Sequence, residues 1–283
     1  MNRTVFVNGE YLPEDQATVS IFDRGFLMAD AVYEVVSVLD GKLLEFSGHL
    51  KRLERSLSEL DMDKPKDFNN LLDIHRELVA RNNVQEGGIY LQISRGVADR
   101  DFIYPKDAEP TLVMFSQERP IIEAPAAKNG MKVISVEDQR WGRRDIKTVQ
   151  LLYPSMAKMM AKTAGVDDAW LVEDGFVTEG TSNNAYIIKD GKIITRSLSH
   201  DILHGITRAS ILRYAAEAQM VVEERNFTIS EAQDADEAFI SSASAFVTPV
   251  VEIDGAKLGD GTPGLVVKRL REIYIEESRK SAI

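Results

Sequence analysis

The chain has no cysteine among its 283 residues. This absence excludes disulfide bonds, thiolate metal sites and a cysteine nucleophile. Only four histidines are present, and they are scattered without the paired spacing of zinc ligands, so no metal site is expected. Any covalent chemistry must therefore depend on a side chain other than cysteine.

Positive charge is also scarce, since 34 Lys and Arg residues face 45 Asp and Glu residues and leave a net charge of −11. This excess of acid opposes binding to nucleic acid and provides no polybasic patch for an anionic membrane. The sequence shows neither the apolar core of a signal peptide nor an uninterrupted apolar stretch of about 18 residues. We therefore expect a cytoplasmic protein that binds small molecules, with no nucleic-acid or membrane partner.

Proline and glycine, at nine and 18 residues, are present in ordinary amounts, and we find no repeat or low-complexity tract. The hydrophobic content of 44% is enough to bury a large core in one large or two medium domains. Two domains are favoured, and the whole chain is expected to fold.

Short alternating apolar segments are joined by residue pairs that prefer tight hairpin turns. These pairs are Asn8-Gly9, Asp40-Gly41, Asp174-Gly175, Asp190-Gly191 and Asp254-Gly255. They predict abundant antiparallel sheet.

An N-terminal α+β domain is predicted over residues 1–116, followed by a linker over 117–121 and a larger domain over 122–283. The first domain is expected to contain an amphipathic helix capped by Ser47, a second helix over 71–79, and strands over 88–94 and 110–116. The leucines of the first helix are Leu50, Leu53, Leu57 and Leu60.

In the second domain no β-α-β rhythm is evident, and strands are predicted over 131–136 and 237–241. The predicted helices cover 155–164, 207–218 and a last segment opened by Thr262-Pro263. In that last helix Val266, Leu270 and Ile273 are expected to face the core.

Lys147 and Glu179 are the two most informative candidates. A lysine forms an imine with an aldehyde only as the neutral amine, so it needs desolvation or nearby positive charge, which Arg143 and Arg144 could supply. Glu179 is expected where a strand ends, before Gly180. Most such glutamates are simply exposed, but a carboxylate against a pyridine nitrogen would keep that nitrogen protonated.

Two segments could hold a phosphate through backbone N–H groups. Gly205-Ile206-Thr207 enters a predicted helix, although Thr207 as an ordinary helix cap explains the same pattern. Ser241 to Ala245 form a small-residue turn that could equally reflect close sheet packing. With Lys147 and Glu179, these segments are the parts that pyridoxal phosphate (PLP) requires.

Arg52 and Tyr153 are less certain candidates. Arg52 lies on the flank of the first helix, from which a guanidinium can reach a phosphate, while a solvated surface position is the ordinary alternative. Tyr153 follows Lys147 closely and could line the substrate side or belong to the core.

Taken together, these residues resemble the fold-type IV PLP enzymes, the family of D-amino-acid aminotransferase, branched-chain aminotransferase and aminodeoxychorismate lyase. The resemblance covers nearly the whole chain and is best with the D-amino-acid aminotransferase branch. Its motifs are Asp23-Arg24-Gly25, Asp30 to Val35, His49 to Leu53, Ser94-Arg95-Gly96, Asp145-Ile146-Lys147, Val177 to Gly180, Gly205 to Arg208 and Val247 to Val250. It implies a two-domain α+β fold with mixed, largely antiparallel sheets and flanking helices.

The resemblance also implies roles for single residues. Lys147 would be the catalytic residue and hold PLP as a Schiff base, Glu179 would pair with the pyridine nitrogen, and Leu203 would pack against the ring. The phosphate would meet Arg52, the Gly205 turn with the N–H groups of Ile206 and Thr207, and the Ser242-Ala243 turn. Ala243 stands where relatives commonly have a threonine, so only a backbone contact carries over there.

The substrate residues implied are Tyr33, Val35, Arg100, Phe102 and Ser182. In the D-specific branch a tyrosine, an arginine and a histidine hold the carboxylate, with a loop that reaches across a homodimer interface near the active site. Tyr33 and Arg100 match, but Phe102 replaces the histidine. A weaker carboxylate site would suit a transaminase that also accepts (R)-primary amines.

The implied reaction is ping-pong transfer of an amino group from a D-amino acid to a 2-oxo acid such as 2-oxoglutarate or pyruvate. Lys147 would act as general base and then acid. An L-branched-chain aminotransferase, an aminodeoxychorismate lyase and a non-catalytic binding protein are the alternatives. Tyr33 and Arg100 favour the D-specific enzyme over the first two.

Overall fold

The computed structural model describes residues 3–283, so residues 1 and 2 of the predicted first domain lie outside the described part. The chain forms two compact units. Unit 1 comprises Met1–Pro120, Ile146–Gln150 and Ser281–Ile283, and unit 2 comprises Ile121–Asp145 and Leu151–Lys280. Residues 146–150 and 281–283, which the sequence assigns to the second domain, thus belong to unit 1.

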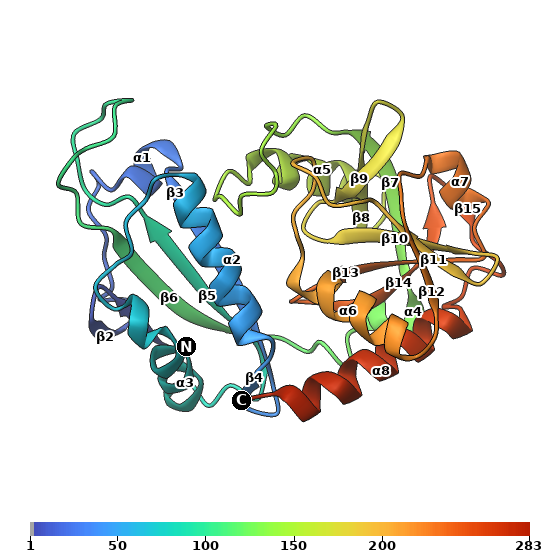
Figure 1. Cartoon of the computed structure of the whole chain (residues 1–283), viewed down its shortest axis with the longest axis horizontal. Helices are drawn as coiled ribbons and strands as arrows, with labels where there is room; N and C mark the ends of the chain where they lie inside the picture. The colour runs from blue at the N-terminus through green and yellow to red at the C-terminus, as the bar shows by residue number, and fades with distance from the viewer. Residues whose placement is uncertain (1–2) are drawn as a thin grey trace. The chain divides into compact units, whose positions relative to one another are not determined.

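Unit 1 is built on an antiparallel six-stranded sheet in the order β2-β1-β6-β5-β3-β4 (Figure 1). The strands are β1 (Thr4–Val7), β2 (Glu10–Pro13), β3 (Ala31–Leu39), β4 (Lys42–Leu43), β5 (Glu86–Ser94) and β6 (Thr111–Glu118). Because β6 continues to Glu118, the predicted linker start at residue 117 is wrong. Gln117 and Glu118 pair with Gly88 and Gly87 of β5.

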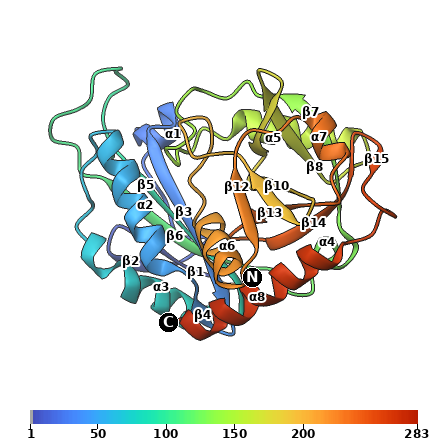
Figure 2. The same cartoon turned by 45° about the vertical axis from the view of Figure 1, so that its right-hand side comes forward.

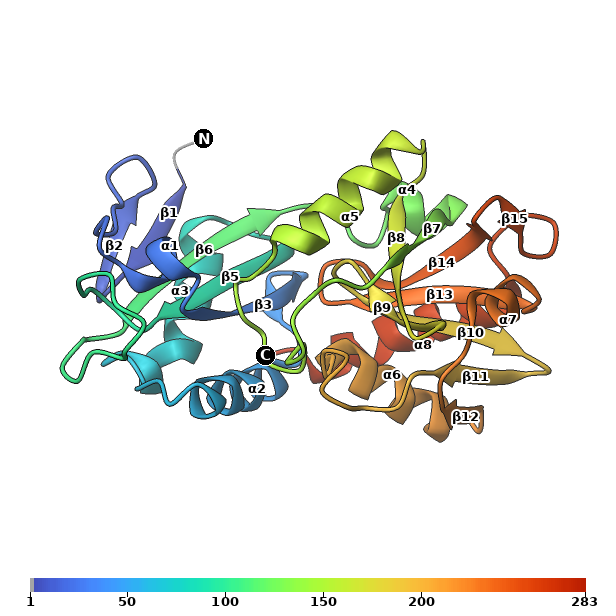
Figure 3. The ribbon, with the colours of Figure 1, turned by 90° about the horizontal axis from the view of Figure 1, so that it is seen from above.

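One face of this sheet is covered by α2 (Phe46–Glu59) and α3 (Leu71–Arg81), as Figure 3 shows. Leu53 and Leu57 of α2 are buried in the same core as Ile89 and Leu91 of β5, so the leucine spacing marks the core face. The predicted cap at Ser47 is wrong. Helix α2 begins one residue earlier, because Glu45 adopts a left-handed conformation (φ 53°) that turns the chain into it.

Two short helical segments complete unit 1. They are α1 (Arg24–Met28) and the 3-10 turn η1 (Phe68–Asn70). Asp23 caps α1 by accepting hydrogen bonds from the N–H groups of Gly25 and Phe26.

Unit 2 contains a nine-stranded mixed sheet in the order β12-β11-β10-β13-β14-β7-β8-β9, with β15 paired to β14. The strands are β7 (Met131–Glu137), β8 (Asp168–Glu173), β9 (Phe176–Gly180), β10 (Asn184–Lys189), β11 (Lys192–Thr195), β12 (Val221–Glu224), β13 (Glu237–Ser242), β14 (Phe246–Ile253) and β15 (Ala256–Lys257). The parallel pairs β7/β8 and β11/β12 are each joined through a helix. The expectation of no β-α-β unit is therefore wrong at these two places.

The helices of unit 2 are α4 (Pro125–Asn129), α5 (Leu152–Thr163), α6 (Ile206–Glu217), α7 (Ile229–Gln233) and α8 (Leu265–Ser281). Helices α6 and α8 lie side by side (Figure 2), where the rings of Tyr214 and Tyr274 meet edge to face. In α8 the fully buried positions include Val267, Leu270 and Tyr274. Val266 and Ile273 are only half-buried, so the predicted core face is wrong by one residue at both positions.

The five predicted hairpin turns are all confirmed. Each joins two antiparallel strands, and in each both turn residues have positive φ, as at Asp174 (52°) and Gly175 (82°) between β8 and β9. No helix within residues 3–283 is long and apolar enough to cross a membrane.

Candidate active site

Lys147 lies on a short extended segment of unit 1 that runs beside β3. The Tyr33 N–H donates to the Lys147 carbonyl at 3.0 Å, and the Val149 N–H donates to the Ala31 carbonyl at 3.1 Å. The preceding residue, Ile146, is buried in the core of unit 1. The backbone at Lys147 is therefore fixed on both sides, and its Nζ lies 4.0 Å from the centroid of the Tyr33 ring.

Lys147 is half-buried, and its amine forms no ion pair with any residue from 3 to 283. Arg143 and Arg144, which the sequence offers as sources of positive charge, are themselves paired within unit 2. Arg143 Nε lies 3.0 Å from Asp145, and both terminal nitrogens of Arg144 donate to Glu173 at 2.7 Å. Their charges are thus partly balanced by carboxylates.

Arg52 belongs to a buried charged network between α2 and the face of β3 that carries Glu34. Its Nε and one terminal nitrogen donate to the two oxygens of Glu34 at 2.8 and 2.7 Å, and His49 Nδ1 lies 2.7 Å from the same carboxylate. Burial alone would raise the pKa of Glu34, but Arg52 and His49 outweigh it and hold that pKa well below its usual range. Arg52 is buried rather than solvated, and Glu34 fixes its orientation.

Tyr33 and Val35 point from β3 to the face opposite Glu34, as the strand period requires. The Tyr33 ring stacks on Tyr90 with centroids 5.6 Å apart, and Tyr90 stacks in turn on Phe115 at 4.7 Å. The two predicted substrate residues therefore belong to an aromatic and apolar surface beside Lys147.

Arg100 and Phe102 lie on an exposed loop of unit 1 between β5 and β6. Phe102 is 79% exposed, and the Arg100 guanidinium lies 5.6 Å from its ring centroid. Arg24 fixes the loop at Asp101, the residue between these two, by donating a hydrogen bond to its carbonyl at 2.6 Å. Arg100 has no ion pair among residues 3–283, so its guanidinium is available to a carboxylate ligand.

Glu179 lies in unit 2 near the end of β9 and is only 3% exposed. Three groups hold its carboxylate: the N–H of Leu203 (3.1 Å), the side-chain amide of Asn184 (3.0 Å) and the guanidinium of Arg140 (2.6 Å). Burial raises the pKa of Glu179, and Arg140 offsets that effect only in part. The exposed alternative for Glu179 does not apply.

The start of α6 leaves backbone donors available. Gly205 is the N-cap and no side chain caps the helix, so Thr207 lies in the first turn and its predicted capping role is wrong. The N–H groups of Ile206 and Thr207 have no side-chain acceptor among residues 3–283. A Cβ at position 205 would overlap Oδ1 of Asn184, the residue that also donates to Glu179. Asn184 therefore lies between Glu179 and the start of α6, and it also donates to the Leu203 carbonyl at 3.0 Å.

The Ser242-Ala243 turn connects β13 and β14 and is half-buried. Ser242 Oγ lies 3.4 Å from Ser244 Oγ, while the neighbouring Ser241 is buried and bonded to the Tyr186 hydroxyl at 2.7 Å. The small side chains therefore leave the turn accessible, whereas Ser241 has a packing role in the sheet.

Two further candidates have clear positions in unit 2. Ser182 is exposed on the turn after β9. The neighbouring Thr181 hydroxyl stabilises this turn by donating a 2.6 Å hydrogen bond to buried Asp168. The Tyr153 hydroxyl donates to the Glu137 carbonyl, and its ring packs against the small core cluster under α5. Tyr153 is therefore half-buried at the edge of this cluster, and its role beside the substrate stays a prediction.

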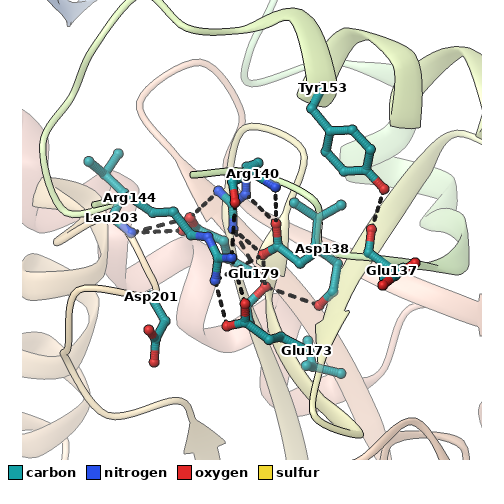
Figure 4. A network of polar contacts seen from close by, with 12 residues as sticks. Glu137, Asp138, Arg140, Arg144, Tyr153, Glu173, Glu179, Asp201 and Leu203 are labelled. Carbon is teal, nitrogen blue, oxygen red and sulfur yellow. Dashed lines mark hydrogen bonds and ion pairs between the residues drawn. The ribbon is translucent and has the colours of Figure 1, made fainter. Parts of the chain in front are cut away.

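Sequence reasoning missed Asn184 and the pair formed by Arg140 and Asp138, which Figure 4 shows beside Glu179. Arg140 and Asp138 follow β7 and form a bidentate ion pair at 2.9 and 2.7 Å. Asn184 opens β10. The acid-base pair two residues apart after a predicted strand was the available signal for Arg140 and Asp138, but only the fold places Glu179 against them.

These groups fit PLP by their chemistry. Unit 1 provides an amine without an ion pair, held on a fixed backbone. Unit 2 provides the buried carboxylate of Glu179, whose pKa is raised by burial more than Arg140 lowers it. It also provides the N–H groups at the start of α6, which no side chain among residues 3–283 caps. A protonated pyridine nitrogen would stabilise such a carboxylate, and a phosphate would satisfy such N–H groups.

The family model for amino-transferase class IV matches residues 31–253. The chain belongs to this family. It is 41% identical to a D-alanine aminotransferase of Staphylococcus haemolyticus, over 98% of this chain and 99% of that protein. It is 38% identical to a D-alanine aminotransferase of Staphylococcus aureus, over 95% of both chains.

A solved structure of a T.th. branched-chain amino acid aminotransferase with pyridoxamine 5'-phosphate is similar throughout. Its TM-score is 0.90 at 27% identity, over 98% of this chain and 94% of that one. The predicted fold-type IV architecture is therefore confirmed. Class IV aminotransferases depend on PLP, and this chain is a PLP-dependent aminotransferase.

Proposed function

We propose that the protein moves the amino group of a D-amino acid, such as D-alanine, to a 2-oxo acid such as 2-oxoglutarate or pyruvate. The observation that carries this proposal is the 41% identity to a D-alanine aminotransferase over nearly the full length of both chains. Tyr33 and Arg100, which match the D-specific pattern, support the handedness.

In this proposal Lys147 holds PLP covalently through Nζ, and Glu179 faces the pyridine nitrogen. When bound, PLP withdraws electrons from the donor's Cα and makes the proton there acidic. Leu203 packs against the ring. The phosphate is held by Arg52, Gly205, Ile206, Thr207, Ser242 and Ala243.

Lys147 is the proposed catalytic base and acid. Its Nζ takes the proton from the donor's Cα and later returns a proton to the Cα of the amino acid formed from the acceptor. The fixed backbone beside β3 limits where that amine can reach, and this restriction supports transfer on one face of the substrate only.

The donor's carboxylate is proposed to meet Tyr33 and Arg100, with Val35, Phe102 and Ser182 lining the substrate side. Phe102 supplies an exposed apolar surface where the D-specific pattern has a histidine. This supports additional activity on (R)-primary amines. Such amines have no carboxylate, so they need no carboxylate ligand.

We further propose that the enzyme is a cytoplasmic homodimer with its active site near the subunit interface. The D-specific pattern, in which the loop carrying Arg100 serves the neighbouring subunit, supports this assembly. Its solution mass, measured by light scattering, would test the dimer directly.

The test of function is the visible absorption spectrum of the purified protein before and after addition of D-alanine, with L-alanine as the control. We expect a cofactor band that D-alanine alone removes, and an oxo acid that then restores it. Removal by L-alanine alone would favour the L-branched-chain enzyme. A band that neither isomer changes would favour the lyase or a preference for amines, and no band with added PLP would refute the proposal.

A further inference from the structure

We propose that Arg140 is a positioning residue that keeps Glu179 ionised and aimed at the cofactor's pyridine nitrogen. This inference rests on the proposed function, since it assigns a role to Arg140 only if Glu179 meets that nitrogen. Arg140 acts through Glu179 and does not touch the substrate.

The first support is geometric. Arg140 donates from one terminal nitrogen to Glu179 Oε1 at 2.6 Å, while its Nε and other terminal nitrogen hold Asp138 at 2.9 and 2.7 Å (Figure 4). A planar guanidinium that grips one carboxylate with two nitrogens has little freedom left. Its third nitrogen therefore meets Glu179 in one fixed orientation.

Asp138 is itself anchored. Its side chain is fully buried, accepts a hydrogen bond from Thr178 at 2.7 Å, and lies 3.5 Å from Arg144. Burial would raise the pKa of Asp138, but Arg140, Thr178 and Arg144 outweigh it and lower that pKa. Asp138 therefore stays charged and holds Arg140 in place from the side away from Glu179.

The second support is electrostatic. Glu179 is buried, and its other hydrogen-bond donors, Leu203 N–H and Asn184, carry no charge. Arg140 is the charged group that contacts this carboxylate among residues 3–283. A buried carboxylate that loses such a partner becomes protonated. A neutral Glu179 could no longer hold a proton on the pyridine nitrogen, and electron withdrawal from the donor's Cα would weaken.

The test compares the PLP-loaded wild type with Arg140→Gln and Arg144→Gln. The cofactor carries nitrogen-15 at its pyridine position, and its NMR shift reports whether that nitrogen is protonated. For Arg140→Gln we expect a shift toward the neutral form and a loss of kcat of about tenfold or more, with little change in KM for D-alanine. Arg144→Gln is the comparison variant: Arg144 lies 3.5 Å from Asp138 but does not contact Glu179, so we expect a clearly smaller change than in Arg140→Gln.

A wild-type nitrogen signal in Arg140→Gln, or an equal change in Arg144→Gln, would overturn the inference. If Arg140→Gln does not fold, Arg140→Lys serves instead: a single ammonium cannot grip Asp138 with two nitrogens and also reach Glu179. We expect an intermediate signal and rate from it, and wild-type values for both would refute the role. A wild type that binds no PLP would refute the proposed function and this inference with it, whereas an unchanged Arg140→Gln in a D-specific holoenzyme refutes the inference alone.

Discussion

At the scale of single residues, the two most informative side chains are held in different ways. Lys147 is positioned by its backbone, which pairs with β3, and its amine has only the Tyr33 ring as a partner among the described residues. Glu179 is positioned through its side chain, which accepts hydrogen bonds from three different groups. Positioning by the backbone alone suits the proposed role of Lys147, whose amine must change partners during turnover. Positioning through the side chain suits the proposed role of Glu179 as a fixed negative charge opposite the pyridine nitrogen.

Lys147→Ala should lower transamination by at least about 100-fold, because it removes the proposed general base. The measurement is the rate with D-alanine, together with mass spectrometry after borohydride reduction, which should attach PLP to the wild type but not to Lys147→Ala. Lys162→Ala is the control, since Lys162 is an exposed lysine on α5. Retention of full activity in Lys147→Ala would remove the lysine from the mechanism.

Arg100→Ala should raise KM for D-alanine by about tenfold, the loss expected for about 1.4 kcal/mol of carboxylate binding. KM for (R)-1-phenylethylamine should stay nearly constant, because this amine has no carboxylate. Steady-state kinetics with both donors decide the matter. Equal effects on the two donors would show that Arg100 is not the carboxylate ligand.

At the scale of elements, the entry to α6 combines a helix start with a demand for glycine. Gly205 has φ −63° and ψ 132°, an ordinary extended conformation, so backbone freedom is not the reason for glycine here. The reason is space, because a Cβ would overlap Asn184 Oδ1. The Gly205 turn resembles a conventional helix cap in sequence. Its lack of a side chain leaves room for Asn184, which donates a hydrogen bond to Glu179.

Gly205→Ala should weaken PLP binding about tenfold and destabilise the fold by about 1–3 kcal/mol, because Asn184 must move to admit the methyl group. Cofactor titration and urea unfolding measure the two effects. Gly142→Ala is the matched control: a Cβ there would meet no atom within 4 Å. Similar PLP affinity in both variants would show that Asn184 gives way without cost to the site.

At the scale of the whole molecule, buried ionisable groups link stability to pH. His75 is 1% exposed, with Nδ1 bonded to the Leu71 carbonyl at 2.6 Å, and its ring packs on Phe46. Burial lowers the pKa of His75 from 6.5 to about 4. As the pH falls below 6.5 the unfolded chain binds a proton that the folded protein does not, so stability is lost between pH 6.5 and about 4.

Urea unfolding across this range should show a steeper loss of stability for the wild type than for His75→Gln. The difference should reach the order of 3 kcal/mol near pH 4, since each pH unit between the two pKa values corresponds to about 1.4 kcal/mol. Glu34, whose pKa is lowered, adds a loss of stability below about pH 4.5 in both proteins. Parallel curves for the two proteins would mean that His75 does not titrate in this way.

The sequence by itself determined the local features. Asn-Gly and Asp-Gly pairs give hairpin turns because their residues tolerate positive φ, and the leucine spacing of α2 gives one apolar face. The motifs around Lys147, Glu179 and Gly205 likewise identified the family, which the comparisons confirm. These signals depend on neighbours within a few residues, so they can be seen without the fold.

Only the tertiary structure decided what these residues contact. Residues 146–150 join unit 1 because Ile146 fits its core and the Lys147 segment pairs with β3, a strand more than 100 residues earlier in the chain. Arg140 meets Glu179 because β8 lies between β7 and β9 in the sheet of unit 2, and the segment that follows β7 reaches the side chain of Glu179 on β9. Pairings over such separations depend on packing and burial rather than on local propensity, and for that reason the sequence alone did not reveal them.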